Sequence, residues 1–72
     1  MKKINNTKEL GETIRKVRKS QSLTQEHLAA TCGVGIRFIR ELEQGKKSCH
    51  IGKAFLVILM LGIEVKLERH SL

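Results

Sequence analysis

The apolar residues recur at helical spacing in four segments of the chain and alternate with charged residues in a fifth. In the first segment Leu10, Ile14 and Val17 are four and three positions apart, which places them on one face of a helix. Residues 63–68, IEVKLE, have a period of two, the mark of a half-buried strand. The segments with helical spacing are residues 7–22, 24–32, 35–44 and 51–61. We therefore expect four helices followed by one short strand.

The expected helices begin and end at residues suited to capping. Thr7 and Thr24 are the expected N-caps, because a side-chain oxygen there can accept a hydrogen bond from a backbone N–H of the first turn. Gly33 is expected to turn the chain with a positive φ, and Gly45 and Gly62 to end the third and fourth helices. These signals divide the centre of the chain into two short helices joined by a tight turn.

The two central helices are expected to pack as one unit. Ala29 is small enough for them to cross closely, and Phe38 is expected to be partly buried beside their contact. The inward positions are Leu28, Ala29, Cys32, Val34, Ile39 and Leu42. Two helices joined by a short glycine-containing turn form the helix-turn-helix motif, whose second helix can enter the DNA major groove.

Size and charge favour a small DNA-binding domain. A chain of 72 residues forms one domain, and at that size only about 60% of the unfolded surface is buried, so oligomerisation is a usual source of added stability. Lys and Arg outnumber Asp and Glu by 14 to 7, and the net charge of +7 favours polyanionic partners. With two Phe and no Trp or Tyr, the chain lacks the aromatic platforms that bind single strands by stacking.

Neither a metal site nor a catalytic site is expected. The two cysteines and three histidines form no CxxC or HxxxH spacing, and the adjacent Cys49 and His50 are only a weak zinc signal. Cys32 lies at an apolar helix position, where packing is its expected role. No nucleophile–base pair, carboxylate pair or phosphate-binding glycine loop is present, so we expect no enzymatic activity and no cofactor.

The C-terminal part carries more apolar surface than one small core can cover. Residues 54–61, AFLVILML, are far shorter than the roughly 20 residues of a membrane span, and no signal-peptide pattern is present, so we expect a cytoplasmic, nucleoid-associated protein. The strand at residues 63–68 has no partner in its own chain. We therefore expect a homodimer in which fourth helices pack together and strands pair between copies. The expected interface residues are Phe55, Ile58, Leu59, Ile63, Val65 and Leu67.

Three stretches of this text, IRKVRKSQSLTQEHLA, GVGIRFIRELEQGK and MLGIEVKL, resemble the Xre-type helix-turn-helix family of phage repressors and bacterial regulators. The resemblance covers residues 10–67. It implies an all-α, lambda-repressor-like domain of four helices with a C-terminal strand that pairs across a dimer. Within the family, the short length and the strand are most similar to HipB-type antitoxins, the DNA-binding partners of HipA-type kinases.

The resemblance also implies roles for individual residues. The base-reading positions of the recognition helix are Gly35, Ile36, Arg37, Arg40 and Glu41. The phosphate-binding positions are Thr24, Gln25, Lys46, Lys47 and Ser48. Arg18 and Glu43 match an ion pair that joins the first helix to the recognition helix, and Gln25 matches a glutamine that also braces that helix.

Some of these roles remain open between base reading and simpler contacts. Gly35 and Ile36 depart from the family pattern, which often has polar residues there, although Ile36 can contact a thymine methyl group. Arg37 and Arg40 can each bind guanine through two hydrogen bonds or contact a phosphate instead. Glu41 can alternatively face solvent and exclude unwanted phosphate positions.

The expected function is that of a transcriptional repressor that binds double-stranded DNA sequence-specifically. It is expected to act as a homodimer on an inverted-repeat operator. The resemblance to HipB-type antitoxins further implies an autoregulating antitoxin that holds a HipA-like kinase toxin. The alternative is a phage-type repressor or restriction-modification controller with no toxin partner, although controllers usually end in a fifth helix rather than a strand.

Overall fold

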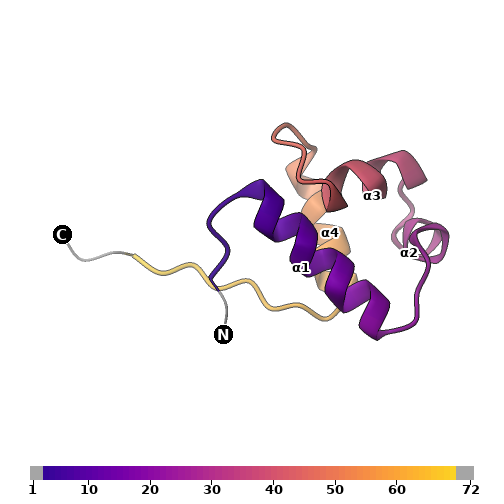
Figure 1. Cartoon of the computed structure of the whole chain (residues 1–72), viewed down its shortest axis with the longest axis horizontal. Coiled ribbons are helices and arrows are strands. Elements are labelled where there is room, and N and C mark those ends of the chain that lie inside the picture. Colours follow the sequence, from indigo (N-terminus) through magenta and orange to yellow (C-terminus); the bar gives the residue numbers. More distant parts are fainter. Residues whose placement is uncertain (1–2, 70–72) are drawn as a thin grey trace.

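The computed structural model describes residues 3–69, which form four helices connected by short turns (Figure 1). The helices are α1 (Thr7–Ser20), α2 (Gln25–Cys32), α3 (Ile36–Glu43) and α4 (Ile51–Met60). α3 packs against both α1 and α2, and α2 also packs against α4. The expected all-α helix-turn-helix fold is confirmed.

One contiguous core lies between the four helices. Its buried members are Ile14, Leu28, Ala29, Cys32, Ile39, Leu42, Ala54, Val57, Ile58 and Leu61. Val34 and Phe38 are partly buried against it. Each helix contributes the side chains of one face, so the spacing of apolar residues accounts for the way the helices turn inward.

The N-cap of α1 differs from the expected one. Asn6 is the cap, and its side-chain oxygen accepts a hydrogen bond of 2.8 Å from the backbone N–H of Glu9. The prediction of Thr7 was wrong, because the backbone is extended at Asn6 and the helix has already begun at Thr7. The Thr7 hydroxyl instead donates to the carbonyl of Gly45 at 2.8 Å, which ties the start of α1 to the end of α3.

All four helices end in the same hydrogen-bonded turn, the Schellman motif. A residue with positive φ follows the last helical turn in each case, at Ser22 (58°), Gly33 (68°), Gly45 (80°) and Gly62 (77°). The next N–H donates to the carbonyl five residues earlier, in the pairs Leu23 to Arg18, Val34 to Ala29, Lys46 to Glu41, and Ile63 to Ile58. Three of these donor residues are apolar and pack against the core, whereas Lys46 is charged and exposed.

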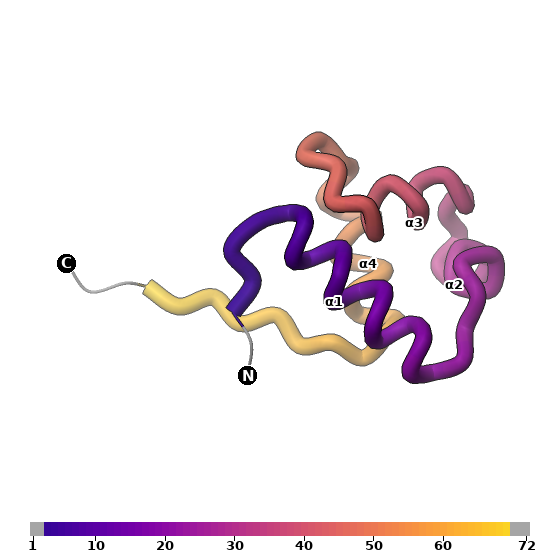
Figure 2. The backbone as a smooth tube through the Cα atoms, in the orientation of Figure 1, coloured from indigo at the N-terminus to yellow at the C-terminus, as the bar shows by residue number. Residues whose placement is uncertain are grey.

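The segment after Gly62 is not a strand in the single chain. It leaves the helices and runs outward at the left of the view, ending in yellow (Figure 2). The predicted strand at residues 63–68 is therefore absent, and no strand occurs anywhere in residues 3–69. The physical reason is that a strand exists only through hydrogen bonds to a neighbouring strand, which this segment does not meet within its chain. Leu67 is consequently 91% exposed.

The apolar surface of α4 is divided between the core and solvent. Ile58 is only 6% exposed, so its assignment to a dimer interface was wrong, because its side chain completes the core of its own subunit. Leu59, by contrast, is 67% exposed. The other exposed apolar side chains of α4 are Ile51, Phe55, Leu56 and Met60. No helix within the described part of the chain has the length and apolar character to cross a membrane.

Gly11 sets the closest approach of α1 to α3, and its replacement by Ala should destabilise the fold. An added Cβ would lie 2.5 Å from the carbonyl oxygen of Leu42 and 2.6 Å from that of Glu43. Helix propensity alone favours Ala by about 1 kcal/mol, but separating the two backbones costs about 1–3 kcal/mol or more. We expect a net loss of stability in urea unfolding, with Glu12→Ala on the exposed face as the control. A more stable Gly11→Ala protein would show that the helices are not packed so closely.

Candidate nucleic-acid interface

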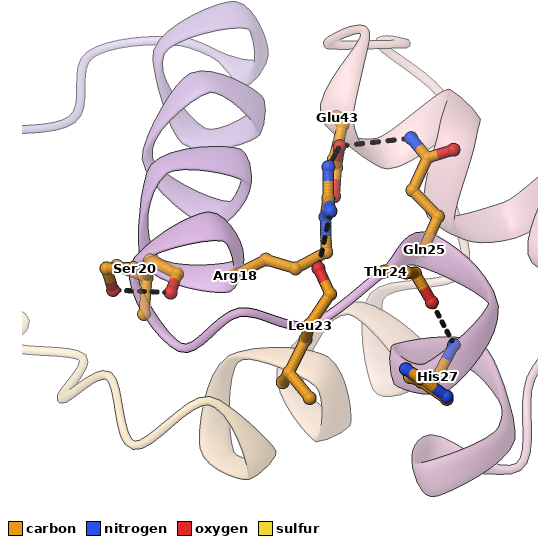
Figure 3. Close-up of polar contacts among 8 residues, drawn as sticks. Arg18, Ser20, Leu23, Thr24, Gln25, His27 and Glu43 are labelled. Carbon is orange, nitrogen blue, oxygen red and sulfur yellow. Dashed lines mark hydrogen bonds and ion pairs between the residues drawn. The ribbon is translucent and has the colours of Figure 1, made fainter.

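A buried ion pair connects α1 to α3 (Figure 3). Arg18 Nε donates to Glu43 Oε2 at 2.6 Å, and Arg18 Nη2 donates to Glu43 Oε1 at 3.0 Å. Their side chains are 8% and 4% exposed. This two-bonded arrangement is the strongest form of Arg–carboxylate contact and fixes the direction of both side chains. The structure thus brings together the two residues for which the family resemblance implied an ion pair.

Two further contacts extend this pair to α2 and to the turn before it. Arg18 Nη1 donates to the backbone carbonyl of Leu23 at 2.7 Å. Gln25 Nε2 donates to Glu43 Oε1 at 3.1 Å, as Figure 3 shows. Within the described residues no buried side-chain nitrogen or oxygen lacks a partner, so the charge of the pair is well compensated. The start of α2 and the end of α3 are therefore held at one junction, which we call the Arg18 junction.

The outer side of α3 is cationic. Arg37 and Arg40 are exposed, whereas Ile39 and Leu42 on the opposite side belong to the core. Ile36 is half-buried against the core, so only part of its side chain is available to a ligand. Gly35 precedes the helix as its N-cap and contributes no side chain, and a Cβ added there would meet nothing within 4 Å.

Glu41 is the acidic residue on this outer side of α3. Lys46 Nζ donates to Glu41 Oε2 at 2.8 Å, and Arg37 Nε lies 3.9 Å from the same oxygen. The hydrogen bond from Lys46 lowers the pKa of the Glu41 carboxyl below its ordinary value, and the charges of Lys46 and Arg37 lower it further. Glu41 is therefore ionised at neutral pH. Lys47 and Ser48 follow in the loop and are exposed.

An open groove lies where the ends of α1, α2 and α3 meet. It brings together four residues with expected roles in binding: Thr24 and Gln25 at the start of α2, and Ile36 and Arg40 of α3. The remaining lining residues are Arg15, Arg18, Leu23, Glu26, Glu43 and Gln44. No individual role was predicted for Arg15, which is one of the basic residues on the outward faces of the first helix and lies one turn before Arg18. The loop at residues 46–48 lies beyond this groove.

The described residues offer no cluster of groups for a metal ion. No three His, Cys, Asp or Glu side chains come together within residues 3–69. Cys32 is buried in the core, and this burial raises the pKa of its thiol. Cys49 is exposed before α4, where the adjacent His50 caps the helix by accepting a hydrogen bond from the backbone N–H of Lys53 at 3.2 Å. Packing accounts for Cys32, and capping of α4 accounts for His50.

A short helix with a cationic outer side, braced from behind by a preceding helix and a tight turn, defines the class of helix-turn-helix DNA-binding transcriptional regulators. The chain belongs to the Xre-type helix-turn-helix family, because the family model described as "Helix-turn-helix" matches it over residues 14–66. It is also similar to the uncharacterized HTH-type transcriptional regulator y4mF of Sinorhizobium fredii. The two are 44% identical over 64 residues, which cover 89% of this chain and 84% of the relative.

Solved structures of HipB have the same fold. The structure titled "HipB-O4 20mer complex" superimposes with a TM-score of 0.87 at 21% identity, covering 99% of this chain and 100% of that one. "Structure of HipA-HipB-O2-O3 complex" gives a TM-score of 0.88 at 21% identity, with the same coverage. At 21% identity these superpositions establish the common fold alone. The resemblance to HipB-type antitoxins is therefore supported at the level of the fold.

Breaking the Arg18–Glu43 pair should destabilise the protein far more than breaking a surface pair. Removal of one partner leaves the other charge buried, so we expect Glu43→Gln to cost about 3–5 kcal/mol, against ~0–1 kcal/mol for an exposed pair. Urea unfolding of the two single variants, with Arg18→Met as the second, and of the double variant measures the coupling between the residues. Glu64→Gln, at an exposed position, is the control. A coupling indistinguishable from zero would contradict the role of the junction.

Proposed function

We propose that the protein is a sequence-specific, double-stranded DNA-binding repressor that acts as a homodimer and serves as the autoregulating antitoxin of a HipA-like toxin–antitoxin system. The observation that carries the DNA-binding part is the division of α3. Its inner side is locked by the core and by the Arg18 junction, while its outer side presents Arg37 and Arg40 to solvent. A rigid helix with exposed guanidinium groups suits the major groove.

In this proposal α3 reads base edges from the major groove. Arg37 and Arg40 each donate two hydrogen bonds to guanine, and the free part of Ile36 contacts a thymine methyl group. Gly35 allows the backbone at the start of α3 to approach the DNA closely, because no side chain stands in the way. Glu41 accepts a hydrogen bond from the amino group of a base.

Phosphate contacts on both sides of α3 position the helix in the groove. Thr24 and Gln25 are at the start of α2, where free backbone N–H groups and the positive end of the helix dipole favour an anion. Lys46, Lys47 and Ser48 form the second set, in the loop after α3. The Gln25 side chain is already bound to Glu43, so a phosphate contact at this residue is directly coupled to the orientation of α3.

The homodimer is supported by the apolar side chains that the single chain leaves in solvent. On α4 these include Phe55 and Leu59, and on the extended segment they include Val65 and Leu67. Ile63 is partly buried against its own core, so only part of its side chain is available to a partner. Packing of two α4 helices, with pairing of the two extended segments, covers this surface and gives the segment its missing backbone partners.

The toxin partner is supported by the common fold with HipB, one of whose structures is titled as a complex with HipA. The first test is the neighbouring gene: we expect one that encodes a HipA-like kinase, and co-expression should give a complex that copurifies. If neither is found, the protein is a repressor or controller without a toxin.

Arginine and lysine substitutions should affect DNA binding in different ways. Arg40→Ala should lower operator affinity by about 1–3 kcal/mol and random-duplex affinity much less, because it removes a base contact. Lys47→Ala should weaken both alike and reduce the salt slope, which we expect to be about −7 for a dimer that neutralises roughly eight phosphates. Fluorescence anisotropy over a salt series measures both quantities. Equal losses on operator and random DNA for Arg40→Ala would make it a phosphate contact, and a salt slope near zero would contradict DNA binding itself.

Truncation of the extended segment should separate the dimer. A chain that ends at Glu64 keeps the hydrogen bond from the N–H of Ile63 to the carbonyl of Ile58, so α4 remains capped. We expect this variant to be monomeric in light scattering, with much reduced operator affinity and unchanged helix content. Leu59→Glu, which places a charge on the exposed side of α4, should have the same effect. A truncated chain that is still dimeric and binds the operator normally would rule out this interface.

A further inference from the structure

The end of α3 differs from the other three helix ends. In a Schellman motif the residue after the positive-φ position commonly makes an apolar contact with the helix. Leu23, Val34 and Ile63 occupy that position after the other helices, and all three pack against the core. After α3 the position is held by Lys46, whose side chain bonds to the Glu41 carboxylate. An ion pair on the surface thus takes the place of an apolar contact.

Two bonds therefore join the same two residues. The backbone N–H of Lys46 donates to the Glu41 carbonyl at 3.1 Å, and its Nζ donates to the Glu41 carboxylate at 2.8 Å. The side chain of Lys46 is still 49% exposed, so it can leave the carboxylate for another anion while the backbone bond persists. The Lys46 ammonium group thus lies beside the outer side of α3, paired with Glu41 but accessible to another anion.

Glu41 is also the one negatively charged residue on the outer side of α3. Arg37 lies 3.9 Å from its carboxylate, and Arg40 is the neighbouring residue. Glu43, the other acidic residue of α3, faces inward and is bound to Arg18. A carboxylate in this place does not help a surface that binds DNA by electrostatics alone. Non-specific affinity rises with each Lys or Arg side chain that neutralises a phosphate, and the carboxylate competes for these side chains.

We propose that Glu41 is a specificity-determining residue, which holds Lys46 and Arg37 in ion pairs and releases them without loss only to DNA that presents a base amino group to its carboxylate. This inference rests on the proposed function. On random DNA, Lys46 and Arg37 exchange the carboxylate for phosphates, and Glu41 is left close to the polyanion without compensation. On the operator, the N4 amino group of cytosine or the N6 amino group of adenine donates to Glu41 and restores a hydrogen bond.

The test compares operator and random duplex for the wild type and for Glu41→Gln, which keeps the shape of the side chain but removes its charge. We expect random-duplex affinity to rise about fivefold or more at low salt, and the ratio of operator to random affinity to fall by about the same factor. Glu12→Gln is the matched control, because Glu12 is exposed on α1 and makes the same change of charge. Its effect should be small and equal on both duplexes.

A second variant tests whether Glu41 acts through its neighbour. In a Lys46→Ala background the gain of random-duplex affinity on Glu41→Gln should shrink to about half or less on a logarithmic scale. In the free protein, NMR titration of the Glu41 carboxyl should show its pKa moving up toward the ordinary value when Lys46 is replaced. This readout requires no DNA.

The outcomes distinguish the specificity proposal for Glu41 from the proposed function of DNA binding. If Glu41→Gln changes operator and random affinity by the same factor, Glu41 contributes only net charge and the specificity proposal is overturned. The proposal is also overturned if the effect is undiminished in the Lys46→Ala background. If the wild-type protein binds no duplex at all, the proposed function itself fails and the specificity proposal falls with it, whatever the titration shows.

Discussion

The buried contact between Arg18 and Glu43 is the interaction on which the arrangement of the other parts depends. It joins the end of α1 to the end of α3, and through Leu23 and Gln25 it also reaches the turn before α2 and the first residue of α2. A charge pair of this kind adds directional bonds that apolar packing alone does not supply. In a chain of 72 residues with a small core, this junction fixes the direction in which α3 faces the solvent.

The direction in which α3 faces determines the charge that its outer side presents to solvent. The apolar residues of α3 face the core, and its inward acid is neutralised by Arg18, so the free charges on its exposed side are mainly cationic. Lys46 and Lys47 continue this charge into the following loop. Preorganised cations at fixed positions give both affinity for phosphate and discrimination between base edges. The single carboxylate at Glu41 then becomes informative, since it opposes the general attraction for DNA.

The helices and the core were predictable because the apolar spacing and the glycines at helix ends are local signals. Gly33, for example, was expected to turn the chain and does so at a φ of 68°. The cap of α1 was missed by one residue, because Asn6 and Thr7 are both good capping residues and only the backbone conformation decides between them. Ile58 was misplaced because a helix that is apolar on all sides does not reveal which side faces the core. Residues 63–68 form no strand in the single chain, because a strand needs a neighbouring strand to pair with and the alternating pattern does not show where that neighbour would be. The contact between Glu41 and Lys46 depends on a helix-end geometry that spacing does not show.

Mapping the DNA contacts by NMR tests the central claim most directly, namely that the outer side of α3 and the loop after it form the nucleic-acid interface. The uniformly labelled protein would be titrated with a duplex from its own upstream region, and the amide shifts followed residue by residue. We predict the largest changes at residues 35–41 and 46–48, with further changes at Thr24 and Gln25. Changes concentrated on α4 and residues 63–69, with α3 unaffected, would contradict this account.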